Sequence, residues 1–516
     1  MRRPLATAAP IAAIALVCAG MLYLPGRTVT AAFINDVLIF LDGAQRITVG
    51  QVPNRDFHTA LGPLVFYIPA IGYLLSSSFG AAMPTGMAAL LVAFIPAMIH
   101  ILPSRLSPPL AIALGTFLIL LLAAPINLGS AIWHLSFAMF YNRIGWFALG
   151  LLLVMYLSPV DQMKKADLAD GFAAALLLLV QFYTKVTYGL VGLGFLVFML
   201  FDQRQRQWVL IALLVTALAA IAIEFFWHGT WDYIEDLIAA AKVSGDHDLL
   251  SLVGNFLNNL ADLTVFGVIA IISLWRTRSV RDFLFYGFCV FAGLLILNQN
   301  AHGWGIITLY CGAAVAVARA TCPRSTKDGT PDLGPRHLIT GLPLALIFFL
   351  LPPVAHHATA LVLHTALATA NAGEPLGLPL FKDVRNLMPP SERNGFMARY
   401  VGSLASGGEL LQTLPTPPER VLVLDFVNPF SAGLGIRPPV GDSAWLHWGR
   451  NVNEKSYLPA EALFADVKIV MIPKIGINSL PLQQLYGSFI SQEFELLRET
   501  GEWKIYQRRQ PEAKTR

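Results

Sequence analysis

The chain has 516 residues, of which 55% are hydrophobic and 13% are charged, with a mean hydropathy of +0.60 and a net charge of +4. A soluble domain carries roughly 25% charged residues, so a wholly soluble protein is excluded. The same figures exclude intrinsic disorder, which needs low hydrophobicity and high net charge, and they argue against a basic nucleic-acid-binding face. What remains is a membrane protein with many spans.

The N-terminus carries Arg2 and Arg3, followed by an apolar run over 4–23. A signal peptide has the same basic start, but this run is long enough to span a bilayer and no convincing cleavage site follows it. We therefore interpret it as an uncleaved first span. Further apolar segments follow at 63–80, 83–103, 108–125, 145–159, 171–187, 188–202, 208–227, 260–275, 283–299, 303–319 and 338–355. Together they predict a polytopic α-helical membrane protein with about 11–13 spans.

The short connections between these segments carry most of the lysines and arginines of the membrane part. The positive-inside rule places these connections on the cytoplasmic side, together with the N-terminus. They hold Lys164, Lys165, Arg204, Arg206, Arg276, Arg278, Arg281, Arg324, Lys327 and Arg336. The loop 228–255 and the tail after residue 356 then face outward. The alternation fails once, between residues 104 and 144: either 128–142 crosses as a short helix, or a neighbouring segment is re-entrant.

The four cysteines are predicted to be structural. Cys18, Cys289, Cys311 and Cys322 lie outside the outward loops and outside the C-terminal region. The sequence has no CxxC pair and no cluster of His and Cys at metal-ligand spacing.

The first outward loop, 26–62, collects three carboxylates, two arginines and one histidine between residues 35 and 58: Asp36, Asp42, Asp56, Arg46, Arg55 and His58. Within it, 29–48 has the pattern of an amphipathic helix at the membrane surface, ended by Gly50 and Pro53. Such a group of side chains can bind a cation, accept a proton or hold a phosphate. The alternative is a polar, solvated connector, which would not need a surface helix.

This loop resembles that of a known family. An Asp follows the first helix, then come an Arg, the pattern G-x-x-P-x-x-D-F at 50–57 and the pair Gly62-Pro63 before the second helix. These features are similar to the GT-C membrane glycosyltransferases, and most of all to the rhizobial lipopolysaccharide-type and protein-mannosyltransferase-like enzymes. The resemblance implies transfer of a sugar from a polyprenyl-phosphate carrier to a glycan, lipid or protein acceptor outside the cytoplasmic membrane.

The resemblance also implies roles for individual residues. An acidic residue of the first loop is the family's catalytic base; the early position matches Asp36, and Asp56 is the second candidate. A divalent ion, Mg²⁺ or Mn²⁺, held by Asp36 and Asp56 is implied as well, although Val37 stands where many relatives have a second carboxylate. Arg46 and His58 are assigned to the binding of substrate or phosphate.

Polar residues at the outward ends of later spans are costly in hydrocarbon and suggest a site. Lys185 either holds the carrier phosphate or extends to the lipid headgroups. Arg143, in Tyr141-Asn142-Arg143, either binds phosphate or anchors its helix end. Asn298 and His302 have groups suited to sugar hydroxyls. Glu224 is interpreted either as a base or as a structural residue. The carboxylates of the loop 228–255, Asp232, Glu235 and Asp236, are expected to face water.

The C-terminal region, 375–510, has the composition of a soluble domain. Buried strands are predicted at 421–425 and 467–473, a helix at 479–492, and a hairpin over 494–497 and 503–506. The stretch 442–448 either packs between domains, which we favour, or contacts a glycan. No nucleotide-binding fingerprint is present, which agrees with a lipid-linked donor.

The sequence thus predicts a membrane domain over 1–360 and an extracytoplasmic α/β domain over 375–510. The predicted function is a glycosyltransferase of the cytoplasmic membrane, with its site at the outward face. Two alternatives remain: a transporter or flippase of lipid-linked glycans, which needs a polar path across the membrane, and a non-enzymatic envelope assembly protein.

Overall fold

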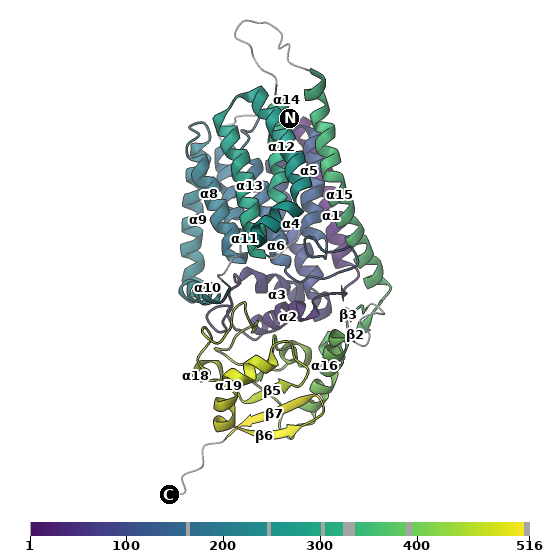
Figure 1. Ribbon diagram of the computed structural model, residues 1–516. Coiled ribbons are helices and arrows are strands. Elements are labelled where there is room, and N and C mark those ends of the chain that lie inside the picture. Colours follow the sequence, from purple (N-terminus) through teal and green to yellow (C-terminus); the bar gives the residue numbers. More distant parts are fainter. Residues whose placement is uncertain are drawn as a thin grey trace.

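The computed structural model describes residues 2–160, 166–244, 249–300, 305–322, 336–388 and 395–509. A bundle of long helices forms one part of the molecule, and a smaller domain of strands and helices lies at one end of it (Figure 1). The fold class predicted from the sequence, a polytopic helical membrane protein with a C-terminal α/β domain, is confirmed.

Within the described residues, seven helices are long and apolar enough to cross a membrane. They are α1 (Arg2–Tyr23), α4 (Phe79–Arg105), α7 (Ala166–Thr184), α9 (Arg206–Trp227), α12 (Leu260–Thr277), α13 (Val280–Asn300) and α15 (Arg336–Thr369). Five apolar helices are shorter: α3 (Leu64–Ser76), α5 (Pro108–Ala123), α6 (Phe140–Val154), α8 (Val186–Met199) and α14 (Ile307–Thr321).

Ion pairs and hydrogen bonds mark the face of the bundle that lies away from the C-terminal domain. Asp282, at the start of α13, accepts hydrogen bonds from Tyr156 at 2.5 Å and from Arg319 at 3.2 Å. Arg281 pairs with Asp202 beyond the end of α8 at 2.5 Å. The ends of α6, α8, α13 and α14 therefore meet there, beside connections that were predicted to be cytoplasmic.

Helix α3 explains why the predicted alternation of loops failed. Gly62, just before α3, donates its N–H to the carbonyl of Thr184 at 3.1 Å, and Gly80, just after it, accepts from Thr28 at 2.7 Å. Both contacts lie at the face that bears the C-terminal domain. Thirteen residues also extend only about 20 Å, less than the roughly 30 Å of a bilayer core. The segment 63–80 therefore does not cross the bundle, which corrects its prediction as a span.

The stretch 128–142 does not form a crossing helix either. Residues 124–139 run irregularly, with a bridge between Ile126 and Leu135, and α6 begins at Phe140. With α3 lying at one face, the remaining apolar helices alternate between the two faces without an exception.

The C-terminal domain is built on a four-stranded sheet with the order β4-β5-β7-β6. Strands β4 (Val421–Val423) and β5 (Ile469–Pro473) are parallel, and β6 (Phe494–Glu499) and β7 (Trp503–Arg508) complete the sheet as a hairpin. Helix α19 (Ser479–Glu493) lies where the sequence predicted it. Helix α16 (Phe396–Gln412) was not predicted; the other short helices are α17 (Phe430–Leu434) and α18 (Ala460–Leu463).

A second sheet ties the start of the chain to this domain. Strand β1 (Thr28–Thr30) runs parallel to β3 (Val384–Asn386), which also pairs with β2 (Glu374–Pro375). A 3₁₀ turn covers Pro379–Phe381. The predicted outward loop 228–255 contains two helices, α10 (Thr230–Ser244) and α11 (Leu249–Asn258). In Figure 1, α2 (Ile34–Thr48), α3 and α10 lie at the junction of the bundle and the C-terminal domain.

Candidate active site

A helix, α2, forms where the sequence predicted one, although it begins at Ile34 rather than near residue 29 and buries most of its residues, Asp42 and Arg46 included, instead of exposing a polar face. Phe33 precedes it in the left-handed region at φ 54°, and the Asp36 N–H donates to the carbonyl of Phe33 at 3.1 Å. Asp36 thus lies in the first turn, where the helix dipole favours a carboxylate.

Asp36 is partly buried, and we call the region around it and Tyr141 the recess. The charge of Asp36 acts on the hydroxyls of Tyr141, at the start of α6, and of Tyr400, on α16. Burial raises the pKa of Asp36 to about 7, while its side chain keeps some exposed surface. A carboxylate with a pKa near neutrality is well suited to accept a proton at physiological pH.

Lys185 lies beside the same tyrosine, in the extended residue between α7 and α8. Its Nζ is 5.6 Å from the centre of the Tyr141 ring and donates to Asn142 Oδ1 at 3.5 Å. Burial, together with the smaller effect of the Arg450 charge, lowers the pKa of Lys185 to about 7. Lys185 therefore lies beside Tyr141, and the charge of Asp36, which the sequence expected at the same membrane face, acts on that tyrosine.

Arg450 is a functional candidate that sequence reasoning missed. It belongs to the C-terminal domain, and its charge acts on both Tyr141 and Lys185. The turn that carries it is fixed by hydrogen bonds from the Arg450 N–H to the His447 carbonyl, at 2.9 Å, and from Asn451 to the Trp445 carbonyl, also at 2.9 Å. A Gly-Arg-Asn turn after an aromatic stretch was the available signal, but nothing in the sequence placed it opposite α7.

An apolar cavity of about 770 Å³ adjoins this recess. It begins beside Asn35, the neighbour of Asp36, and is lined by Leu363 and Leu367 of α15 and by Met388 and Met397 of the following segment. Helix α15 therefore contributes an apolar surface to this cavity.

Arg46 does not join the recess. Its Nε donates to Asp42 at 2.6 Å, and Nη1 and Nη2 donate to the two oxygens of Asp442 at 2.6 and 2.9 Å. All three side chains are 0% exposed. Because one arginine serves two carboxylates, burial still raises the pKa of Asp42 to about 6. Arg46 connects α2 to the C-terminal domain, so we leave it out of the expected phosphate site. The interdomain role favoured for the stretch 442–448 accords with this contact.

Asp56 and His58 hold the shape of the first loop. Asp56 accepts the N–H of Val52 at 2.7 Å and pairs with Arg55 at 3.2 Å. His58 contacts Asp236 of α10 through Nδ1 at 2.8 Å, and this hydrogen bond raises the pKa of His58. Asp236, which the sequence assigned to water, also accepts the Thr59 N–H at 2.8 Å and is 10% exposed. That expectation was wrong because its partners are remote in sequence.

The donor set for the expected divalent ion is not assembled here. Among the residues that the structure describes, no group of three or more His, Cys, Asp or Glu side chains comes together. The charge of Asp36 acts on tyrosines, whereas Asp56 is bonded to Val52 and Arg55. Since Mg²⁺ and Mn²⁺ take several oxygen ligands, the Asp36–Asp56 pair does not fit such an ion, and we derive no step through one.

Arg143 faces a different part of the bundle. Its guanidinium lies 6.0 Å from the Phe137 ring, and its charge acts on His357 and His364 of α15. It is fully buried, and its nitrogens have no hydrogen-bond partner among the described residues. Residues two apart on a helix point in nearly opposite directions, so Arg143 turns away from the Lys185 side of Tyr141. Its phosphate-binding role remains a separate prediction.

The remaining predicted site residues have different outcomes. Glu224 accepts the N–H and hydroxyl of Thr230 at 3.1 and 2.5 Å, which is a structural contact at the start of α10. Asn298 accepts a hydrogen bond from Asn255 at 3.3 Å. His302 lies outside the described residues.

Comparisons with known proteins give only distant similarity. The sequence matches no protein-family model and none of the curated proteins. Among solved structures, the chain is similar to ArnT from Cupriavidus metallidurans in the apo state, with 13% identity and a TM-score of 0.46 over 96% of each chain. ArnT bound to undecaprenyl phosphate gives 13% identity and 0.45, over 96% of this chain and 97% of that chain. The arabinofuranosyltransferase AftD from Mycobacteria gives 12% and 0.42, over 98% of this chain and 40% of that chain. TM-scores this low do not establish a common fold, so function is argued from this chain's own residues.

Proposed function

We propose that the chain is a membrane glycosyltransferase of the GT-C type, which moves a sugar from a polyprenyl-phosphate carrier to a glycan, lipid or protein acceptor. One observation carries the proposal: the cation Lys185 lies 5.6 Å from the centre of the Tyr141 ring, and the charge of Asp36, a carboxylate with a pKa of about 7, acts on the hydroxyl of the same tyrosine. A base for the acceptor and a positive charge for a phosphate are the two groups that such a transfer needs.

The reaction follows from these positions. Asp36 takes the proton of the acceptor hydroxyl as the acceptor oxygen attacks the anomeric carbon of the donor sugar. The bond between that carbon and the carrier phosphate oxygen breaks, and its electron pair stays on the polyprenyl phosphate. Lys185 and Arg450 stabilise the negative charge that develops on the leaving phosphate. In this scheme Asp36 accepts the proton, while Lys185 and Arg450 supply the positive charge for the leaving phosphate.

The surroundings of the recess suit a lipid-linked donor. An apolar cavity of about 770 Å³ starts at Asn35, which is the neighbour of Asp36 in the chain. A polyprenyl chain needs an apolar surface that is open to the bilayer, and α15 supplies part of that cavity wall. We place the protein in the cytoplasmic membrane with this face and the C-terminal domain outside the cytoplasm, because the described basic residues Arg281 and Arg319 lie at the other face.

Reconstituted protein tests the proposal directly. Purified chain in nanodiscs is incubated with polyprenyl-phosphate-linked mannose or arabinose, and release of free polyprenyl phosphate is followed together with transfer of the sugar to added envelope glycan. We expect sugar loss from the carrier that depends on the protein. Movement of intact donor across proteoliposomes without cleavage would instead support a flippase, and neither event would support an assembly protein; both results overturn the proposal.

A further inference from the structure

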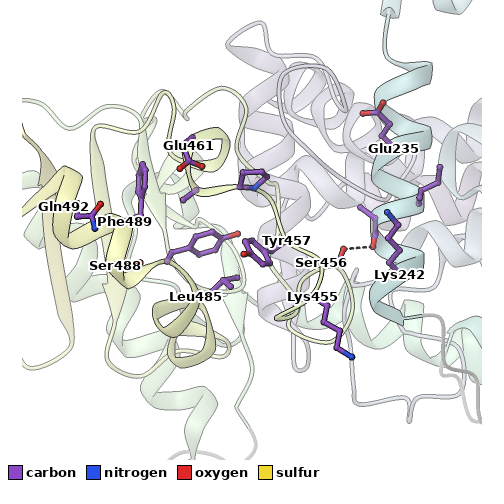
Figure 2. A pocket seen from close by; sticks show the side chains of 15 residues that line it. Glu235, Lys242, Lys455, Ser456, Tyr457, Glu461, Leu485, Ser488, Phe489 and Gln492 are labelled. Carbon is purple, nitrogen blue, oxygen red and sulfur yellow. Dashed lines mark hydrogen bonds between the residues drawn. The ribbon is translucent and has the colours of Figure 1, made fainter.

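A groove of about 860 Å³ lies between helix α10 and the C-terminal domain, away from the recess around Tyr141 (Figure 2). One wall is α10, which carries Glu235 and Lys242. The other wall is formed by the segment 455–461 and by α19. Its size falls in the range of roughly 300–1,000 Å³ typical of clefts that bind ligands of several rings.

The groove is lined by rings and by neutral polar groups. Tyr457 is 47% exposed, and Phe489 lies on the neighbouring α19. Ser456, Ser488 and Gln492 supply hydroxyl and amide groups. Aromatic faces pack against the apolar faces of sugar rings, while hydroxyls, amides and carboxylates bond the sugar hydroxyls.

The charges of the groove cancel. Glu235 and Glu461 are offset by Lys242 and Lys455, and Figure 2 shows them distributed around the opening. A surface for a polyanion or a polycation would carry one sign in excess. A neutral, hydroxyl-rich chain is the ligand that this mixture suits.

Tyr457 is held in a defined position. Its ring meets that of Tyr486 edge to face, with centroids 6.1 Å apart and planes at 85°. Tyr486 is buried at 1% exposure, and its hydroxyl donates to the Leu458 carbonyl at 2.9 Å. Ser456 donates to the Ala239 carbonyl of α10 at 3.4 Å, which joins the two walls. The exposed ring is therefore a preorganised platform, which lowers the entropy cost of binding.

The groove continues towards the recess. A smaller cavity of about 90 Å³ shares Ala239, Ser456 and Tyr457 with it and reaches Asn451 at its other end. Asn451 is the neighbour of Arg450, whose charge acts on Lys185 and Tyr141. The smaller cavity thus joins the groove to the turn that carries Arg450.

We propose that this groove binds the acceptor and that the acceptor is a saccharide chain, with Tyr457 as its stacking platform. The inference rests on the proposed function, which leaves open whether the acceptor is a glycan, a lipid or a protein. It selects a glycan.

Binding without donor tests the groove independently of transfer. Fluorescently labelled linear hexasaccharides of α-mannan, α-arabinan and β-glucan are titrated against the full chain in nanodiscs, and anisotropy is measured. We expect at least one to bind, and Tyr457→Ala to weaken that binding about tenfold. Tyr457→Phe keeps the ring and should bind as wild type does. Leu480→Ala is the matched control, because Leu480 is 68% exposed on the same α19 outside the groove.

A second variant, which blocks the groove, keeps the test valid if Tyr457→Ala does not fold. Ser488→Trp fills the groove from its exposed wall and should abolish binding while the thermal midpoint stays unchanged. Absence of binding by all three oligosaccharides, binding that neither variant affects, or binding of a hexapeptide instead would overturn the proposal. If sugar transfer requires Asp36 but is unchanged in Tyr457→Ala and Ser488→Trp, the groove proposal is refuted and the proposed function stands. Groove binding without cleavage of any donor refutes the proposed function alone.

Discussion

Replacing Arg46 with methionine should destabilise the junction between α2 and the C-terminal domain. The substitution leaves Asp42 and Asp442, both 0% exposed, facing each other without a positive charge. Removing one partner of a buried ion pair costs about 3–5 kcal/mol because the remaining charge is left in a medium of low dielectric constant. For a cooperative unit the size of the C-terminal region, that loss lowers the midpoint of thermal unfolding by about 6–20 °C.

The pH dependence separates this cause from simple loss of packing. In the variant, the folded pKa values of the two carboxylates rise above their unfolded values, so stability is lost as pH rises and regained as pH falls and they protonate. The difference in thermal midpoint between wild type and Arg46→Met should therefore be smaller at pH 5.5 than at pH 8. Unfolding is followed by tryptophan fluorescence of the nanodisc-bound protein at both pH values.

Arg420→Met is the matched control. Arg420 pairs with Asp466 at 2.7 Å in the same domain, but the two side chains are 35% and 28% exposed. Exposed pairs contribute about 0–1 kcal/mol, so its midpoint should stay near that of wild type. Two results would refute the role of Arg46 as the buried partner of Asp42 and Asp442. One is a thermal midpoint of Arg46→Met equal to that of Arg420→Met, and the other is a loss of thermal midpoint that does not depend on pH.

Three further variants probe the recess. Lys185→Met should weaken binding of polyprenyl phosphate about 10–100-fold, as expected for loss of a charge-assisted hydrogen bond; unchanged affinity would show that Lys185 does not hold the phosphate. Arg450→Ala should raise the pKa of Lys185 and weaken carrier binding more at low salt than at high salt, since screening already reduces its contribution; an effect that does not change with salt would assign Arg450 to packing. Asp56→Asn keeps an acceptor for the Val52 N–H, so turnover should remain within about threefold of wild type; a loss as large as that of an Asp36 variant would restore Asp56 as a catalytic candidate.

Local pattern was sufficient for much of the fold. The apolar runs predicted most of the bundle helices, and alternation in 467–473 and 494–506 predicted β5 and the β6–β7 hairpin. The error at 63–80 has a specific cause: this run is as apolar as a span, but α3 is only 13 residues long and both its ends bond to the same face. Composition reports burial in an apolar medium and does not distinguish crossing from lying at the surface.

The site was predictable only where one loop or helix end carried the signal. Asp36 was identified from the polar first loop and its resemblance to a known family, and Lys185 because it is an expensive polar group at the end of an apolar run. Arg450 and Tyr400 act on the same recess from a domain more than 200 residues further along the chain, and no local pattern shows that approach. The same limit explains Arg46, which looked like a phosphate ligand until Asp442 was placed beside it.

The central claim is that Asp36 is the base of a sugar transfer, and Asp36→Asn tests it most directly. In wild type, kcat/KM should rise with pH through about 7 as Asp36 ionises and fall above about 7 as Lys185 loses its proton in the enzyme without substrate. Transfer from a polyprenyl-phosphate-linked sugar is measured across this range, with polyprenyl phosphate affinity as the control for folding. The account predicts a loss of about 10²–10⁴-fold in kcat and disappearance of the rising limb, with carrier affinity retained. Transfer at the wild-type rate with an unchanged pH profile would contradict it.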